Sequence, residues 1–320
     1  YRSISLISHM CKIMLNVLLE RMKGALEAQL SEEQGGFRKD RSTVQQILTL
    51  RLIAEEVTER QGKLYNCFID FQKAFDSVWH QGLWAVLNNM MVPEKLVTTI
   101  KALYEHSQVA VRSGETIGDW VKMTVGSRQG DPLSPLLFTA LLEKVMEKME
   151  CEERGGVKIQ GQVIKDLRFA DDIDMLAKSE EDLQSQVTSV HEDSKRYGLQ
   201  MNKKKTKVMV MGKENSDANI QVEGEEIECV NQFIYLGSLI SNDNDCSKEI
   251  KRRIGIAVGA LGKLCDIWKS SSVLLKEKMK LLDACVFSTL MYACETWTLK
   301  KTDIQRLNSF EMKCYRKVLG

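Results

Sequence analysis

Two adjacent acidic residues, Asp171 and Asp172, interrupt an apolar stretch in the second half of the chain. Apolar side chains lie on both sides of the pair, at Val163, Ile164, Leu167, Ile173, Met175 and Leu176. We interpret the pair as the bend of a hairpin whose strands are otherwise buried. An ionised carboxylate that is removed from water needs a partner, and a bound cation is the usual one. Taken alone, the pair fits either a metal site or an exposed turn.

A third acid, Asp70, lies late in the run 64–71, whose apolar and aromatic residues predict a buried strand. Two strands that each bring a carboxylate to one end of a sheet can hold two Mg²⁺ ions about 3.5–4 Å apart. Oxygen ligands suit Mg²⁺, which also takes oxygens from substrate phosphates, and Mn²⁺ is an alternative ion. A simpler interpretation is that Asp70 caps a helix that begins near Ala74.

The segment 126–135, GSRQGDPLSP, is unusually rich in glycine, proline and small polar residues and precedes an apolar helix. Its glycines let the backbone approach a flat or anionic ligand. Arg128 and Gln129 can donate hydrogen bonds to such a ligand. The segment therefore predicts a binding loop more than an ordinary turn.

These residues need a framework of helices and strands. Apolar periodicity, caps and turn residues predict helices at 5–28, 43–60, 77–89, 93–106, 132–150 and 179–198, and helical structure from 248 to the end. Strands are predicted at 64–71, 207–211 and 233–236, with hairpins at 109–125, at 156–176 (turn at 160–162) and around Gly224. Hairpins with helices packed on them predict an α+β fold with an antiparallel sheet.

The charges are divided unevenly along the chain, although the net charge is only +1. Residues 246–320 carry 15 Lys and Arg against 7 Asp and Glu, and the other residues carry 30 against 37. An acidic body joined to a basic segment suits metal binding in one part and phosphate binding in the other, although basic helices are also often simple solvated faces. No run of about 18 apolar residues is present, so no membrane span is expected.

The nine cysteines include no Cys-x-x-Cys pair, and several, such as Cys67 and Cys285, lie in apolar runs. We expect reduced, buried thiols rather than zinc ligands or disulfides. The first residue is not Met and the last residues continue a helical pattern, so we interpret the chain as part of a longer protein.

Taken together, these motifs resemble those of reverse transcriptases of the non-LTR (LINE-type) retrotransposons. The resemblance lies in 68–76 (FIDFQKAFD), 128–135 (RQGDPLSP) and 169–172 (FADD), which are similar to motifs A, B and C of that family. It continues in 1–6 and 34–43, similar to the fingers motifs, in 198–207, similar to motif D, and in 233–237 (FIYLG), similar to the primer grip. The tail 292–298 is similar to the region after the polymerase in endonuclease–reverse transcriptase elements.

The resemblance implies a role for each matching residue. Asp70, Asp171 and Asp172 would be the metal ligands, and Lys205 would neutralise or protonate the leaving pyrophosphate. The nucleotide would be bound by Arg2, Arg38, Phe71, Phe75, Gln129 and Gly130, with Phe75 excluding a ribose 2′-hydroxyl. Tyr235, Leu236 and Gly237 would form the primer grip. Phe75 could instead be a core residue at a strand–helix junction, and Lys205 part of a solvated run.

The implied fold is a right-hand polymerase with helical fingers at 1–62, an antiparallel-sheet palm at 63–241 that includes inserted fingers elements, and a basic helical thumb beginning in 242–320. Its expected partners are an RNA template with a DNA primer, and deoxynucleoside triphosphates. The resemblance further implies an endonuclease domain in the parent protein, DNA synthesis in the nucleus and RNA capture in the cytoplasm. Ser3 stands where the family usually has Pro, and Gly35-Gly36 is doubled relative to the commonest form.

Two other functions remain open on the sequence. The chain could be an inactive or domesticated remnant that binds RNA by shape, in which case RNA binding would survive removal of the metal. It could also be a two-metal nuclease using the same carboxylates, although such an enzyme would need neither Phe75 nor the loop at 128–135.

Overall fold

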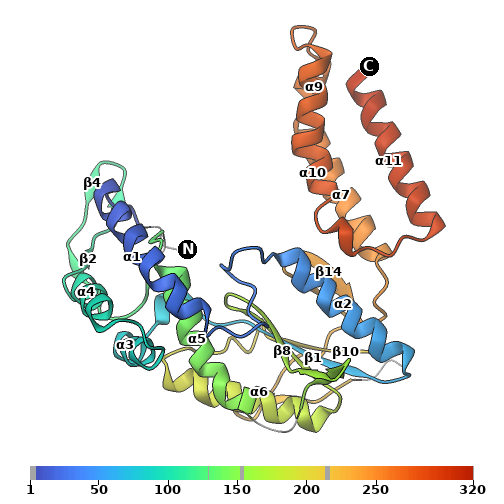
Figure 1. The fold of residues 1–320 in the computed structure, drawn as a ribbon. Helices are drawn as coiled ribbons and strands as arrows, with labels where there is room; N and C mark the ends of the chain where they lie inside the picture. Colours follow the sequence, from blue (N-terminus) through green and yellow to red (C-terminus); the bar gives the residue numbers. More distant parts are fainter. Residues whose placement is uncertain (1–4, 129, 152–154, 213–216, 320) are drawn as a thin grey trace.

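A four-stranded antiparallel sheet lies at the centre of the protein in the computed structural model (Figure 1). Its strand order is β10-β1-β9-β8, formed by Lys207–Met211, Leu64–Ile69, Asp172–Ala177 and Asp166–Phe169. The structure describes residues 5–128, 130–151, 155–212 and 217–319. The predicted α+β class with an antiparallel sheet is confirmed.

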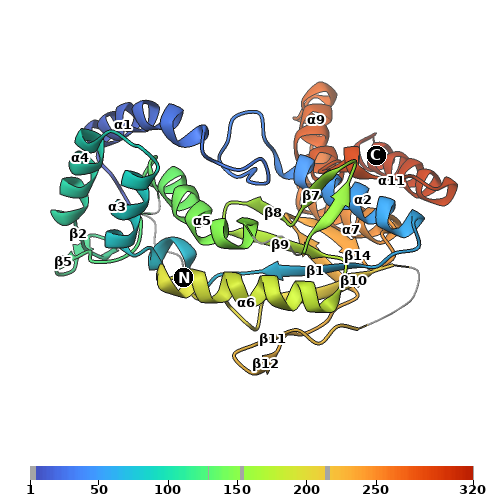
Figure 2. The same ribbon diagram turned by 60° about the horizontal axis from the view of Figure 1, so that its bottom comes forward.

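The side chains of the sheet alternate between two apolar cores, as expected for strands buried on both faces. Cys67 and Ile69 of β1 face the core that contains α5 (Ser134–Cys151) and α6 (Glu180–Arg196). Leu64 and Phe68 face a second core under α2 (Thr43–Glu59). The sheet is therefore covered by helices on both sides, as Figure 2 also shows.

The remaining helices before the C-terminal region surround one end of this sandwich (Figure 1). They are α1 (His9–Glu27), the 3₁₀ turn η1 (Ala74–Ser77), α3 (His80–Asn89) and α4 (Glu94–Glu105). Ser8 caps α1 by accepting from the Cys11 amide, so the helix begins later than the predicted residue 5. The single helix predicted at 77–89 is replaced by η1 and α3, because an extended segment at Val78 and Trp79 separates them.

The other strands form short hairpins outside the central sheet. They are β2–β5 (Gln108–Val109 with Val121–Lys122), β3–β4 (Arg112–Ser113 with Thr116–Ile117), β6–β7 (Val157–Ile159 with Gln162–Ile164), β11–β12 (Gln221–Val222 with Glu225–Glu226) and β13–β14 (Gln232–Tyr235 with Ser238–Ser241). The prediction of one hairpin over 156–176 is wrong. β6 and β7 pair only with each other, whereas β8, with Asp166 and Arg168 buried, pairs with β9 in the central sheet.

The C-terminal region has a small core of its own, which contains Trp268, Leu282, Phe310 and Cys314. Its elements are α7 (Ser247–Lys263), α8 (Cys265–Lys269), α9 (Leu275–Leu281), the π-helical turn η2 (Leu282–Phe287), α10 (Ser288–Leu290), the 3₁₀ turn η3 (Cys294–Thr296) and α11 (Lys301–Leu319). The helices stand together above the sheet (Figure 1). The predicted helical structure is confirmed, with a break between α10 and α11.

The cysteines are all free thiols, and Cys67, Cys246 and Cys314 are buried as expected. Cys285, in the π-helical turn, is exposed, contrary to the burial expected from its apolar surroundings in sequence. Across the described part of the chain, no helix combines the length and apolar character that a membrane span needs.

Candidate active site

The antiparallel pairing of β1 with β9 brings Asp70 and Asp172 to the same end of the sheet. Ile69, the last residue of β1, pairs with Ile173, so Asp70 follows β1 where Asp172 begins β9. Both carboxylates line a cavity of about 480 Å³. The opposite wall of this cavity is the turn between β13 and β14.

The backbone of Asp70 is held firmly, whereas its carboxylate is not. Its amide donates to Thr206 Oγ1 (3.3 Å), and its carbonyl accepts from the Asn202 amide (2.7 Å). Oδ2 is buried but accepts no hydrogen bond, and the Lys205 Nζ atom lies 3.6 Å away. A buried carboxylate oxygen in this state is a suitable ligand for a cation, because desolvation without a partner is costly.

Asp171 lies in the two-residue turn that joins β8 to β9, next to Ala170. Ala170 has a positive φ of 60°, a conformation that costs an alanine energy. The Gln34 side-chain oxygen accepts from the Ala170 amide (3.0 Å) and from the Gly36 amide (2.7 Å). The loop between α1 and α2 (residues 28–42, the N-terminal loop) thereby holds the turn at 170–171 (the acidic turn) in its strained conformation.

Gly36 packs directly against this turn. A Cβ at residue 36 would lie 2.1 Å from the backbone nitrogen of Ala170. Only glycine therefore fits without a shift of the turn. The doubled glycine at 35–36 was the one visible signal of this contact in the sequence, and the role of Gln34 had no local signal.

Arg168 lies under the acidic turn and is completely buried. Its Nε lies 2.7 Å from Asp166 Oδ1, and its guanidinium also pairs with Glu143 (3.4 Å) and Glu150. Burial raises the pKa of Asp166 to about 6, although the charge of Arg168 opposes that change. The network fixes β8 to α5, and sequence reasoning missed it because Glu143 and Glu150 lie on a different element from Arg168.

The structure brings only part of the predicted metal site together. Asp70 and Asp172 share the cavity, while Asp171 is half-buried in the adjoining turn. Over the residues that can be described, no three His, Cys, Asp or Glu side chains are already grouped to hold a metal ion. Mg²⁺ commonly uses one or two protein carboxylates with waters and substrate phosphates, so the available carboxylates fit such an ion. The participation of Asp171 stays a prediction.

Phe75 lies between the loop at 126–135 and the core that contains α5 and α6. Its ring stacks on Phe138 (4.6 Å between centroids) and meets Phe37 edge-on (6.4 Å). The Phe75 carbonyl accepts from the Ser127 amide (2.6 Å) and hydroxyl (3.1 Å), which ties the loop at 126–135 to the end of η1. In that loop, Gly130 is exposed and has a φ of 102°.

Other predicted nucleotide-binding residues have structural partners. The side chain of Arg38 is only 10% exposed and binds Glu27 (3.1 Å) and the carbonyl of Ser31 (2.6 Å). Phe71 is buried in the core of α5 and α6, so its side chain is not free to stack on a nucleotide. Arg2 and Gln129 lie outside the described residues.

Arg128 supports the loop from inside. Its Nη2 donates to the Leu103 carbonyl (3.1 Å) and to Ser107, and its guanidinium lies 5.3 Å from the centroid of the Tyr104 ring. We expected this guanidinium to donate to a ligand, but its hydrogen bonds go to the end of α4.

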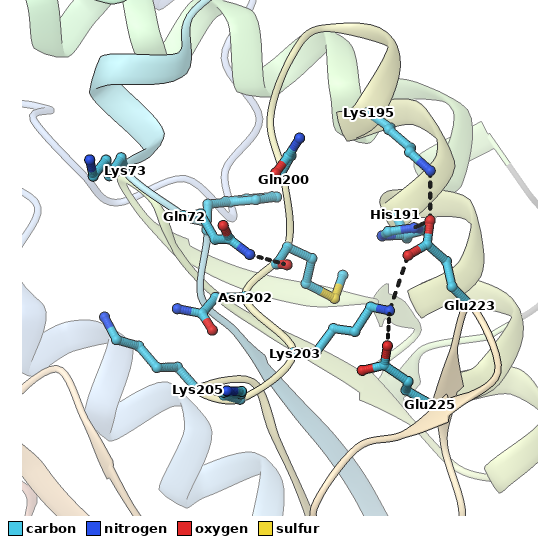
Figure 3. A pocket seen from close by; sticks show the side chains of 13 residues that line it. Gln72, Lys73, His191, Lys195, Gln200, Asn202, Lys203, Lys205, Glu223 and Glu225 are labelled. Carbon is cyan, nitrogen blue, oxygen red and sulfur yellow. Dashed lines mark hydrogen bonds and ion pairs between the residues drawn. The ribbon is translucent and has the colours of Figure 1, made fainter.

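Lys205 belongs to an exposed lysine turn that separates two cavities. Lys204 and Lys205 line both the 480 Å³ cavity and a neighbouring one of about 730 Å³, shown in Figure 3. In that second cavity, Lys203 binds Glu223 (3.1 Å) and Glu225 (3.0 Å). Lys205 itself is 66% exposed, so its side chain is free to turn toward a substrate.

The β13–β14 turn faces the acids across the cavity. Leu236 (φ 45°) and Gly237 (φ 83°) are both left-handed, which is the conformation of a tight type I′ turn. Glycine adopts it easily, whereas a leucine there costs of order 1–3 kcal/mol and persists only where its surroundings hold it. Tyr235 is buried against Phe68, and burial raises the pKa of its hydroxyl.

Asp174 is a further buried acid, two residues beyond Asp172 on the same face of the sheet. Both of its carboxylate oxygens are buried without a hydrogen bond, and burial raises the pKa of the carboxyl group. Its position among apolar residues is consistent with this burial, although the sequence analysis assigned it no role.

Comparison with known proteins identifies the family of the chain. Residues 1–240 match the family described as reverse transcriptase (RNA-dependent DNA polymerase). The match covers most of the chain, and the protein therefore belongs to this family.

Its relatives include the Retrovirus-related Pol polyprotein from type-1 retrotransposable element R2 of Nasonia vitripennis, which is 30% identical over 174 residues, covering 54% of this chain and 17% of that protein. The probable RNA-directed DNA polymerase from transposon X-element of Drosophila melanogaster is 26% identical over 335 residues, covering 100% of this chain and 36% of that protein. The chain thus spans little more than a third of these relatives at most.

The fold is also similar to that of apo telomerase from Candida tropicalis. The two share a TM-score of 0.53 and 14% identity, over 95% of this chain and 54% of the telomerase chain. At this identity the likeness concerns the fold alone.

Proposed function

We propose that this chain is an RNA-directed DNA polymerase that extends a primer with deoxynucleotides. The observation that carries this proposal is the shared cavity of Asp70 and Asp172, closed on its far side by Leu236 and Gly237. The site combines the carboxylates of Asp70 and Asp172, the exposed side chain of Lys205 and the facing β13–β14 turn. Such a site suits a polyphosphate and a hydroxyl nucleophile. Membership of the reverse transcriptase family supports the same activity.

In this proposal the chain has the layout of a right-hand polymerase. The fingers comprise 1–62 together with elements inserted in the middle region, the palm comprises 63–241 and the thumb begins in 242–320. The central sheet and its two helical layers support the palm, and the separate C-terminal core supports a thumb.

Asp70, Asp171 and Asp172 would hold two Mg²⁺ ions, for which Mn²⁺ can substitute. The bound ions would lower the pKa of the attacking hydroxyl and neutralise phosphate charge. The primer 3′-oxygen forms a bond to the α-phosphorus of the nucleotide, the bond to pyrophosphate breaks, and the hydroxyl proton passes to solvent. Lys205 would leave its contact with Asp70 to neutralise or protonate the pyrophosphate.

Selection of deoxynucleotides would fall to Phe75, because a ring fixed between Phe37 and Phe138 cannot move aside for a 2′-hydroxyl. Gln129 and Gly130 would lie against the nucleotide and template base. Arg2 and Arg38 would bind phosphate, which for Arg38 requires release of its contacts with Glu27 and Ser31.

Tyr235, Leu236 and Gly237 would hold the primer terminus, and the basic region 246–320 would bind the RNA template and DNA primer through phosphates. The relatives are longer proteins, and we propose that the parent of this chain carries an endonuclease domain. DNA synthesis would then take place in the nucleus after RNA capture in the cytoplasm.

Primer extension on an RNA template with a DNA primer, Mg²⁺ and deoxynucleotides tests the proposal. We expect the wild-type chain to extend the primer, and the Asp171→Asn/Asp172→Asn double variant to bind the duplex without extending it. Melting curves of both proteins verify that the substitutions leave the fold intact.

Two outcomes would contradict the proposal. A folded chain that binds RNA equally with and without a chelator, and never extends the primer, would be a non-catalytic RNA-binding remnant. Metal-dependent cleavage without nucleotide-dependent extension would identify a nuclease.

A further inference from the structure

Tyr292 joins three parts of the molecule through a single hydroxyl group. It lies between α10 and η3, beyond the residues that match the reverse transcriptase family. Its hydroxyl donates to the Leu236 carbonyl (2.8 Å) and lies 3.0 Å from Thr43 Oγ1. A phenol has one proton and a carbonyl cannot donate, so the Thr43 hydroxyl is the donor in the second contact.

The other carbonyl of the β13–β14 turn is held from α7. Arg252 donates to the Gly237 carbonyl (2.7 Å), and Arg253 donates to the same oxygen. The Arg253 guanidinium also lies over the Tyr292 ring, 4.4 Å from its centroid. The Tyr292 ring and the two arginines therefore form one packed unit.

Glu249 orients these arginines from a fully buried position. Its carboxylate accepts from Arg253 Nε (2.6 Å) and Arg252 Nε (2.7 Å), and also from the Leu239 amide (2.9 Å) on β14. Charge-assisted hydrogen bonds of this kind are short and directional. The C-terminal region thus fixes both the turn and the strand that follows it.

The turn requires such support because of its conformation. Leu236 holds a left-handed backbone that a leucine rarely adopts. At Gly237, a Cβ would lie 3.5 Å from the Tyr292 ring, so the ring covers this residue closely. On its other side the turn lines the cavity of Asp70 and Asp172.

Thr43 connects this support to the acidic turn. Thr43 is the first residue of α2, directly after the N-terminal loop whose Gln34 and Gly36 hold Ala170. The same loop is therefore anchored at the acids at one end and at Tyr292 at the other. Residues 34–43 therefore contact both the turn that carries Asp171 and the residue that supports the β13–β14 turn.

We propose that Tyr292 is a positioning residue, whose hydroxyl fixes the β13–β14 turn against the primer terminus. The inference rests on the proposed polymerase function. Tyr292 touches no reacting atom. It acts through the Leu236 carbonyl, and Thr43 sets the direction of its hydroxyl.

The test compares Tyr292→Phe with the wild-type chain, because phenylalanine keeps the ring under Arg253 and removes only the hydroxyl. Thr43→Val removes the second partner, and Thr43→Ser restores it. Tyr315→Phe is the matched control, since the Tyr315 hydroxyl makes an exposed hydrogen bond to Glu311 (2.9 Å) within α11. Each variant is measured for single-turnover extension, duplex Kd and Tm, and for the fluorescence of 2-aminopurine at the primer 3′ end without nucleotides.

We expect Tyr292→Phe to lower the single-turnover rate about tenfold, the loss of about one well-placed hydrogen bond. Duplex Kd and Tm stay close to wild type, while 2-aminopurine becomes brighter because the terminal base is less firmly stacked. Thr43→Val has the same effects to a smaller extent. Thr43→Ser and Tyr315→Phe behave as wild type.

Unchanged rate and fluorescence in Tyr292→Phe would overturn the inference, as would a rate loss matched by equal losses of duplex affinity and Tm. If the wild-type chain extends no primer, the proposed function fails. The fluorescence measurement needs no catalysis, and it then still decides whether Tyr292 positions the primer terminus.

Discussion

The two sides of the cluster of Asp70, Asp171 and Asp172 differ in how firmly the surrounding residues are held. On one side, Arg168, Gln34 and Gly36 form a buried layer in which the backbone of the acidic turn has close partners. On the other side, Lys205 is mostly exposed, and its ion pair with Asp70 is 3.6 Å long. The buried side sets the position of the acids, and the exposed side is free to respond to a substrate. Substitutions on the two sides should therefore fail in different ways.

The largest expected effect is on the buried side, at Arg168. Arg168→Met leaves Asp166 buried without its cation, and breaking a buried ion pair in this way costs about 3–5 kcal/mol of unfolding free energy. Urea unfolding followed by circular dichroism measures the loss. Arg60→Met is the control, because the Arg60 side chain is 64% exposed and pairs only at the surface with Glu56. An equal loss of unfolding free energy in the two variants would show that the buried ion pairs of Arg168 stabilise the fold no more than a surface pair does.

Gly36→Ala should act on geometry more than on stability. The added methyl group would overlap Ala170, and such overpacking costs about 1–3 kcal/mol. If the acidic turn shifts to relieve it, primer extension falls about a hundredfold, equivalent to about 2.7 kcal/mol.

Gly24→Ala is the matched control for this substitution, since a Cβ at residue 24 meets nothing within 4 Å and helix α1 gains from alanine. Extension by Gly36→Ala at the wild-type rate would mean that the N-terminal loop does not set the acidic turn.

A smaller effect is expected on the exposed side. Lys205→Ala should lower the rate of the chemical step about tenfold with little change in Tm, because the side chain contributes charge and almost no packing. Rapid-quench primer extension measures it, with Lys204→Ala as the neighbouring control. Equal loss of rate in both variants would indicate a general effect of lysine charge and contradict a specific role for Lys205.

The smallest effect concerns Glu223, in the second cavity. Hydrogen bonds from Lys195, Lys203 and His191 lower the pKa of this carboxyl to about 2. A depressed pKa contributes stability that is complete above the unfolded value of about 4.3 and is lost as pH falls through about 2.

Glu223→Gln should therefore lower Tm slightly at both pH 7 and pH 4, relative to the exposed hairpin residue Glu226→Gln. A difference present at pH 7 but absent at pH 4 would contradict the lowered pKa.

Sequence reasoning found the side chains that face the cavity and missed those that support them. Asp70 stood out as a carboxylate late in an apolar, strand-like run, and Asp171 and Asp172 stood out as an acidic pair inside an apolar stretch. The contacts of Arg168 with Glu143, of Ala170 with Gln34 and of Leu236 with Tyr292 join residues that are distant in the chain. Local composition carries no record of such pairs.

Contacts between residues that are distant in the chain also account for the predictions that were wrong. The apolar residues of 156–176 are compatible with one hairpin, but the structure divides them between two, β6 with β7 and β8 with β9. Cys285 lies on the exposed side of a π-helical turn, and its apolar neighbours in sequence do not reveal which side it takes. Arg38 was expected to bind phosphate, but its guanidinium donates to Glu27 and Ser31. Arg128 was expected to donate to a flat or anionic ligand, but its Nη2 donates to Leu103 and Ser107.

The hydrogen bond between Gln34 and Ala170 spans 136 positions of the chain. During synthesis the N-terminal loop is made long before the acidic turn, and the turn can take its left-handed shape only after the two meet. Contacts of such long range form late, because the intervening chain must be ordered first. Catalytic geometry would thus be among the last properties the folding chain acquires, and local detachment of one loop would remove it while the sheet remains folded.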